Sequence, residues 1–340
     1  MDDGINNSDS DGDMSSYNSD DEAMECFAEQ QRDHEWAMRK IVRNDPTFTT
    51  FYINAEMVYD WGVLGTVVGR NTQLKEIILF NEMGMGNIPD NSVRDFASGL
   101  VSNRSIQKLS IANWNHYDRD YPHSRVRDYP HSRVEAWNLL TRFFIDNEAF
   151  CSLELELRWN MGDHRDLISA LQSFVSLKEF KLSNHTATPG DIRVDDDVID
   201  ALVKHHTGLK KLTFDGFDIG RGGCAALVTS SLTELYLNQC NHSDEEAARV
   251  FSNGLARNTT LKKLEISRNS IGDTWINALT NALLNNCTLK ELTIYENPDV
   301  TPAGWANFST VLRNPTSALE VLKVWSDSIN DEVLYSFAGA

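Results

Sequence analysis

The sequence has no long apolar run, few prolines and few cysteines. It never approaches the roughly 18 consecutive apolar residues that a membrane-spanning helix needs. Its N-terminus also lacks the basic and apolar regions of a secretory signal. The cysteines are scattered without a CxxC pair, at Cys26, Cys151, Cys224, Cys240 and Cys287. We therefore expect no membrane association and a reduced compartment, the cytoplasm or, as an alternative, the nucleus.

Positive charge is also scarce. Lys and Arg number 31 against 50 Asp and Glu, which gives a formal net charge of −19. A protein that binds nucleic acid in general needs a basic face to overcome repulsion by the phosphates. The charge balance therefore argues against general nucleic-acid binding. Two interpretations of the acidic surface stay open, namely solubility and attraction to a basic partner.

A repeat dominates the rest of the chain. Three segments, LKKLEISRNSI, LKELTIYENPD and LEVLKVWSDSI, begin at Leu261, Leu289 and Leu319. Counted from that first leucine, each has apolar residues at positions 1, 4 and 6, and Asn or Asp at position 9. The same phase, followed backwards, gives ten starts: Phe48, Leu74, Ile106, Ser152, Leu177, Leu209, Leu232, Leu261, Leu289 and Leu319. Repeats found at this spacing indicate a solenoid.

Each repeat changes its hydrophobic period halfway. Positions 4 and 6 alternate as on one face of a strand. The apolar residues that follow step by three and four, as in Ile276, Leu279 and Leu283, which is typical of a helix. Starts between Leu232 and Leu319 lie 29, 28 and 30 residues apart, enough for a strand, a helix and two turns. We expect position 9, Asn269 or Asn297, to be buried and hydrogen-bonded to the turn backbone.

This pattern resembles the leucine-rich repeat of the ribonuclease-inhibitor type, whose consensus is similar to LxxLxLxxNxI followed by a helix. The resemblance runs from Phe48 to the C-terminus and is strongest after Leu209. It implies an α/β leucine-rich-repeat solenoid, a horseshoe with parallel strands on the concave face and helices on the convex face. One repeat cannot bury its own apolar face, so its stability comes from stacking against neighbours.

The ends of the array differ from its middle. Residues 1–25 hold nine acidic residues and no Lys or Arg, which predicts a disordered acidic tail. Residues 26–47 are expected to form a capping helix, and 48–340 about ten repeats. The chain stops within the last repeat's helix, so three explanations are open: a loose cap, a truncated sequence, or an edge covered by another chain. A tandem octapeptide, RDYPHSRV at 119–126 and again at 127–134, is expected in a protruding loop.

Residues that suggest chemistry have simpler interpretations. The glycines from Gly220 to Gly223 lack the Lys-Ser/Thr of a phosphate-binding loop and fit a strand-to-helix turn. Cys224 fits a helix face, and the histidines have no companions at metal-ligand spacing. We therefore expect no catalytic residue, no metal site, no cofactor and no enzymatic activity.

A binding surface is the remaining candidate site. Positions 5, 7 and 8 face the concave side or its rim, and most of them are small or polar. Aromatic and charged residues interrupt this background at Tyr236, Arg268, Tyr295, Glu296, Lys323 and Trp325, and a second, weaker spot is Arg158 with Trp159. Exposed Trp, Tyr and Arg on one face are typical of interface hot spots. The alternative is that these aromatics merely suit strands, or that Trp325 packs against the C-terminal edge.

The sequence thus favours a non-catalytic scaffold or adaptor that binds another protein on its concave face. Two alternatives stay open. One is a Ran GTPase-activating protein-like regulator, although that family's acidic stretch is C-terminal and its activating arginine maps onto no residue here. The other is a recognition fragment of a larger immune-receptor-like or ubiquitin-ligase protein. The chain is expected to be monomeric unless another chain covers its C-terminal edge.

Overall fold

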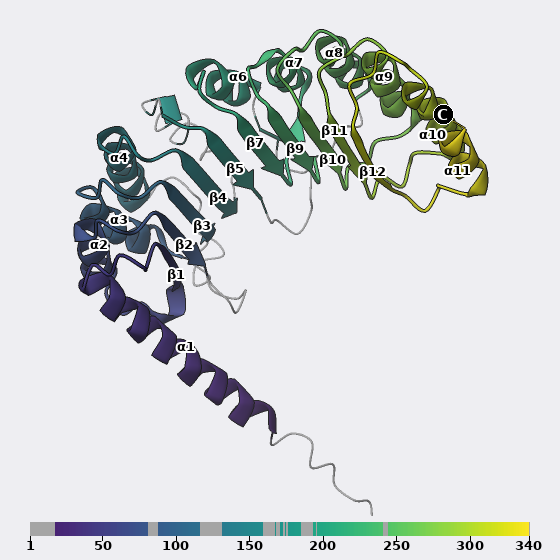
Figure 1. Cartoon of the computed structure of the whole chain (residues 1–340). Helices are drawn as coiled ribbons and strands as arrows, with labels where there is room; N and C mark the ends of the chain where they lie inside the picture. Colours follow the sequence, from purple (N-terminus) through teal and green to yellow (C-terminus); the bar gives the residue numbers. More distant parts are fainter. Residues whose placement is uncertain are drawn as a thin grey trace, which may run out of the picture.

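The protein is an α/β repeat solenoid, seen in a computed structural model that describes residues 18–80, 88–115, 131–158, 167, 171–172, 174, 176–184, 193–194, 196–240 and 244–339. Ten parallel strands form one open sheet that lines the inner side of an arc (Figure 1). The strands are β1 (Thr50–Asn54), β2 (Glu76–Phe80), β3 (Lys108–Asn115), β4 (Ser152–Arg158), β5 (Glu179–Ser183), β7 (Lys211–Asp215), β9 (Glu234–Asn238), β10 (Lys263–Ser267), β11 (Glu291–Tyr295) and β12 (Val321–Trp325).

Helices alternate with these strands; the first extends from the N-terminal end of the arc, and the later ones cover its outer side (Figure 1). They are α1 (Asn18–Val42), α2 (Trp61–Arg70), α3 (Asp90–Leu100), α4 (His131–Asp146), α6 (Asp196–His205), α7 (Arg221–Thr229), α8 (Glu245–Leu255), α9 (Asp273–Leu283), α10 (Pro302–Leu312) and α11 (Asp331–Ala338). A short 3-10 helix (Ala55–Met57) follows β1, and β6 (Arg193–Val194) pairs with β8 (Asp218–Ile219) outside the main sheet. Within the described ranges, no helix combines the length and apolarity needed to cross a membrane.

The alternation of the strands puts positions 4 and 6 into one continuous core. Leu264 pairs with Leu235 and Leu292, and Ile266 with Leu237 and Ile294, in equal register. All six side chains are fully buried. Burial on this scale against the helices is the main source of stability in a stacked array. The expected parallel sheet through Leu264, Leu292 and Leu322 is confirmed.

Position 9 is a hydrogen-bonding site between repeats. Asn269 donates from Nδ2 to the carbonyl of Leu237 at 2.9 Å, and Asn297 donates to that of Ile266 at 3.0 Å. Both side chains are buried. The prediction that these asparagines are buried and bonded to backbone is therefore confirmed. In the repeat before them, Cys240 takes the same place with its thiol 3.6 Å from the carbonyl of Phe214.

A second asparagine ladder runs along the other rim, three residues before position 1, and the sequence analysis missed it. Asn286 donates from Nδ2 to the carbonyl of Leu255 at 2.7 Å, while its Oδ1 accepts the backbone N–H groups of Thr288 and Leu289. Asn71, Asn103, Asn147 and Asn258 make the same kinds of bonds in their repeats. Consecutive repeats are therefore tied by side-chain amides at both rims.

The register of β4 corrects one predicted repeat start. Ser152 pairs with Lys108, which is at position 3, so position 1 of this repeat is Phe150 and not Ser152. Apolar residues recur at every second position, at Leu153, Leu155 and Leu157. This alternation alone does not distinguish two registers that are shifted by two residues. The choice comes from Phe150, which is fully buried with its ring centroid 4.8 Å from that of Phe144.

Two boundaries also differ from expectation. Helix α1 begins at Asn18, so part of the segment assigned to the tail is helical, whereas 1–17 lies outside the described residues. Helix α4 begins at His131, so the last four residues of the octapeptide tract are helical, and 116–130 lies outside the described residues.

Helices α2 and α3 approach each other closely through glycines. A Cβ atom on Gly99 would lie 2.2 Å from the carbonyl carbon of Gly65, and one on Gly69 would lie 2.1 Å from the carbonyl oxygen of Gly99. No side chain fits at those distances, so glycine is required at this crossing.

Candidate binding surface

Positions 3, 5 and 7 of the strands form the concave face, and position 3 carries alternating charge. Along the sheet the row runs Glu76, Lys108, Ser152, Glu179, Lys211, Glu234, Lys263 and Glu291. Lys108 lies 3.1 Å from Glu76 and 3.1 Å from Glu154, and Lys263 lies 3.5 Å from Glu291. The middle of the concave face therefore carries charges of both signs, and several of them are paired within the face. The surface predicted from the sequence comprised only positions 5, 7 and 8 and so did not include this row.

Tyr236, on β9, is engaged by this row. The Nζ atoms of Lys211 and Lys263 lie 5.4 and 5.5 Å from its ring centroid, within the range of a cation–π contact. Its hydroxyl donates to Glu234 at 2.8 Å. Burial and the neighbouring Glu234 carboxylate both raise the pKa of Tyr236. Tyr236 is thus engaged by side chains of the position-3 row. It lies two strands away from Tyr295, and the two tyrosines do not belong to one cluster.

The other predicted residues of this end come together on β10, β11 and β12. We call Arg268, Tyr295, Glu296, Lys323 and Trp325 the C-terminal patch. Tyr295 and Trp325 are register partners whose ring centroids lie 5.8 Å apart at an interplanar angle of 58°. The guanidinium carbon of Arg268 lies 6.0 Å from the Tyr295 ring centroid. Trp325 is 64% exposed, so its ring contacts the preceding repeat and still faces solvent.

Left-handed residues at position 8 bring the charged side chains of this patch together. Gly216, Gln239, Arg268 and Glu296 share positive φ values of 83°, 50°, 56° and 50°. In each, the backbone N–H donates to the position-7 carbonyl of the next strand, for example Arg268 to Tyr295 at 2.8 Å. A left-handed non-glycine residue costs about 1–2 kcal/mol, and this added backbone bond helps to offset it. Four consecutive repeats share this left-handed turn at position 8, so it belongs to the repeat structure and is not specific to the patch.

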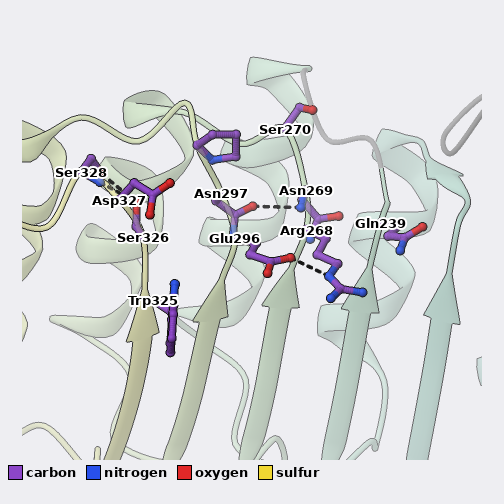
Figure 2. Close-up of a pocket in the computed structure, with 11 residues that line it drawn as sticks. Gln239, Arg268, Asn269, Ser270, Glu296, Asn297, Trp325, Ser326, Asp327 and Ser328 are labelled. Atoms are coloured by element: carbon purple, nitrogen blue, oxygen red, sulfur yellow. Dashed lines mark hydrogen bonds and ion pairs between the residues drawn. The ribbon is translucent and has the colours of Figure 1, made fainter. Parts of the chain in front are cut away.

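Arg268 and Glu296 form an ion pair on the rim that this turn creates. Nε of Arg268 donates to Oε2 of Glu296 at 2.7 Å (Figure 2). The hydrogen bond from Arg268 holds the pKa of Glu296 below its ordinary value. Both side chains are about half exposed, so the pair adds little to stability. Its effect is to neutralise the guanidinium from within the chain.

A hollow of about 740 Å³ opens at the carboxyl ends of these strands (Figure 2). Trp325, Arg268 and Glu296 form part of its wall, and Asn269, Asn297 and Asp327 form the part nearer the turns. The sequence analysis did not assign Asp327 to the site. The sequence did contain an indication, because Asp327 replaces the position-9 Asn of the two preceding repeats. In the structure the Asp327 side chain is exposed, whereas those Asn side chains are buried.

The second predicted spot is not brought to this patch. Arg158 is the last residue of β4, far along the sheet from β12, and its side chain lies outside the description. The corrected register moves it from position 7 to position 9 of its repeat. Trp159 lies outside the described residues.

The described cysteines do not form a reactive centre. Cys151, Cys224, Cys240 and Cys287 are free thiols. Burial raises the pKa of the Cys224 thiol to about 12 and also raises that of Cys240, so neither is a nucleophile at neutral pH. Gly220 caps α7, as expected of a strand-to-helix turn. In the ranges that the structure covers, no group of three or more His, Cys, Asp or Glu is placed to hold a metal ion.

Comparison with known proteins gives likeness in structure and none in sequence. No protein-family model matches the chain, and no curated protein sequence matches it. A solved structure of leiomodin-1 actin-binding site 2 is similar at 14% identity over 50% of this chain and 87% of that chain, with a TM-score of 0.34. A protein from Bacteroides fragilis is similar at 14% identity over 77% of this chain and 68% of that one, with a TM-score of 0.44.

Proposed function

We propose that the chain is a leucine-rich-repeat protein of the ribonuclease-inhibitor type that binds another protein on its concave face and carries no catalytic chemistry. The repeat pattern, with apolar positions 1, 4 and 6 and an amide at position 9, supports the family. Apart from the shifted register of β4, the described strands and helices fall where that pattern predicts them. The binding function is supported chiefly by one observation, the C-terminal patch.

This patch has the composition and place of an interface centre. The rings of Trp325 and Tyr295 lie against each other on adjacent strands, tilted at 58°, Arg268 lies over Tyr295, and a hollow opens beside them. Trp, Tyr and Arg carry a disproportionate share of binding energy in protein interfaces. An exposed Trp on the concave face exposes apolar area that a partner would bury. In the middle of the face, by contrast, Tyr236 is already engaged by Lys211, Lys263 and Glu234.

The test is binding of the native partner to single variants of the full chain. A partner captured from native cells is purified, and its affinity for the wild-type protein and for Trp325→Ala and Tyr295→Ala is measured by calorimetry. Each substitution is expected to weaken binding by about 1–4 kcal/mol. The melting curves are expected to stay close to wild type, because both side chains stand on the surface side of their strands.

Tyr52→Ala is the matched control. Tyr52 occupies position 5 of β1, at the other end of the same concave face, and is 63% exposed. Its removal is expected to leave the affinity unchanged. Normal binding by both patch variants, or unfolding of their C-terminal repeats, would show that the patch is structural.

A further inference from the structure

The hollow beside the C-terminal patch has a chemical preference of its own, and this deepens the proposed function by naming what the partner places there. Three features of its wall determine this preference. They are an exposed aromatic ring, a cation that already has partners within the chain, and hydrogen-bond acceptors that do not all have partners. Trp325 supplies the ring and is 64% exposed. The negative face of an indole ring attracts cations more strongly than any other aromatic side chain does.

The cation of the wall is already engaged. Arg268 donates to Glu296 at 2.7 Å and lies over the ring of Tyr295 (Figure 2). Its guanidinium would have to give up both contacts to meet an anionic ligand. An acidic partner side chain therefore finds no open positive group in this wall.

The acceptors of the wall are not all engaged. Asp327 is exposed and makes no hydrogen bond or ion pair with any described residue. Asn269 is buried, and its Oδ1 has no donor among the described residues. Asp327 lies two residues after Trp325 in the same chain segment, at the mouth of the hollow (Figure 2). The open groups are thus a π face and a carboxylate.

We infer that the hollow binds a cationic side chain, Lys or Arg, from an exposed segment of the partner protein. The cation stacks on Trp325 and pairs with Asp327. The net charge of −19 favours the approach of such a segment. Lys323, exposed two residues before Trp325 and outside the wall of the hollow, confines the cation to the Asp327 side. This inference rests on the proposed function and adds the chemistry of the partner.

The test uses the full chain labelled with 5-fluorotryptophan and observed by fluorine NMR. The eight tryptophans give eight signals, and Trp325→Phe assigns the signal of Trp325 by its loss. The probes are two capped peptides, Gly-Arg-Gly-Arg-Gly and Gly-Glu-Gly-Glu-Gly. We expect the Trp325 signal to shift saturably with the arginine peptide and to stay in place with the glutamate peptide.

Two variants of the wall separate this inference from non-specific attraction. Asp327→Asn should weaken the arginine peptide about threefold, the typical effect of one exposed ion pair. Arg268→Gln releases the carboxylate of Glu296 and should tighten the peptide by a similar factor. Lys323→Gln is the control for net charge and should tighten the peptide by less than Arg268→Gln does. An unmoved Trp325 signal, an equal response to both peptides, or an unchanged affinity in Asp327→Asn would overturn the inference.

The outcome for the proposed function is read separately, from the native partner. If Trp325→Ala abolishes partner binding while the two peptides are not distinguished, the binding surface stands and the cationic occupant is wrong. If the peptides are distinguished but the partner binds Trp325→Ala normally, the hollow takes cations without being the partner's site. That result overturns the inference, which assigns the cation to the partner, together with the proposed surface.

Discussion

The side-chain oxygen of Asn297 accepts the backbone N–H of Asn269 at 3.0 Å, across the boundary between two repeats. Its nitrogen meanwhile donates to the carbonyl of Ile266. One amide therefore accepts from the buried N–H of Asn269 and adds a hydrogen bond to the carbonyl of Ile266 in the neighbouring repeat. A buried polar backbone group without a partner destabilises the fold, so the Asn297 side chain has a structural role.

Replacing Asn297 by Ala should destabilise the protein by about 1–3 kcal/mol, because the buried N–H of Asn269 is left without a partner and the bond to the Ile266 carbonyl is lost. Urea unfolding measures the change. Asp327→Ala is the matched control, since it alters position 9 of the last repeat, where the side chain is exposed, and it should change the free energy of unfolding by less than about 0.5 kcal/mol. Equal effects of the two substitutions would contradict the role given to position 9.

Gly99→Ala should also destabilise, by about 1–3 kcal/mol, because the new methyl group collides with the backbone of α2. Gly208→Ala is the comparison. A Cβ at that site would lie 3.7 Å from the nearest atom, the carbonyl oxygen of Leu177, an ordinary contact. Thermal unfolding of both variants checks the prediction, and a Gly99→Ala protein as stable as wild type would show that the two helices can separate at little cost.

Deleting 127–134 should leave the fold intact and the melting temperature within a few degrees of wild type. The expected reason is that the two octapeptides are identical, so the first copy can replace the second at the start of α4. After the deletion, His123 to Val126 of the first copy directly precede Glu135 and restore the first turn of α4. Deleting 135–142 instead removes buried α4 residues such as Trp137 and Leu140 and should unfold the region. A large loss of stability in the first variant would mean that the second copy makes contacts of its own.

His206 should make the protein sensitive to acid. It stands where other repeats have the rim asparagine, and it is buried with its ring 6.1 Å from that of Phe174. Burial lowers its pKa from 6.5 to about 4. Between those values the unfolded chain binds a proton that the folded protein rejects, so the free energy of unfolding falls as the pH drops from about 6.5 to about 4.

Urea unfolding of His206→Asn at pH 7 and pH 5 tests this. The variant should lose less stability on acidification than the wild type, by about 1–2 kcal/mol, because asparagine fits the rim ladder and does not titrate. The adjacent His205 is exposed, and His205→Asn should keep most of the wild-type pH dependence. Identical pH profiles of wild type and His206→Asn would refute the assignment.

The fold could be predicted from the sequence because its signal is repeated. Nine of the ten strand registers follow from the leucine phase, and β4 failed because Leu157 prolongs the alternation and conceals the contribution of Phe150. The rim asparagines, Asn258 and Asn286 among them, were missed because they lie outside the apolar pattern that defined the repeat. Their spacing from the next leucine was nevertheless constant in the printed sequence.

The candidate site could be predicted only in part. Position numbers placed Tyr295 and Trp325 on the concave face, and the sheet register makes them neighbours. They did not show that Tyr236 lies between Lys211 and Lys263, since that depends on the position-3 row. They also could not show the hollow, which exists because left-handed residues at position 8 turn Arg268 and Glu296 onto one rim. Such turns leave no hydrophobic signature.

The two asparagine ladders have a consequence for the cooperativity of unfolding. In a linear array, each unit is stabilised by its interfaces with its neighbours. The rim amides occur from Asn71 to Asn147 and again from Asn258 onwards, whereas Phe174, His206 and Thr229 take the same place, three residues before position 1, in the repeats between them. The chain should therefore open as two blocks separated near β5 and β7, with amide hydrogens there exchanging before those of β2 or β10.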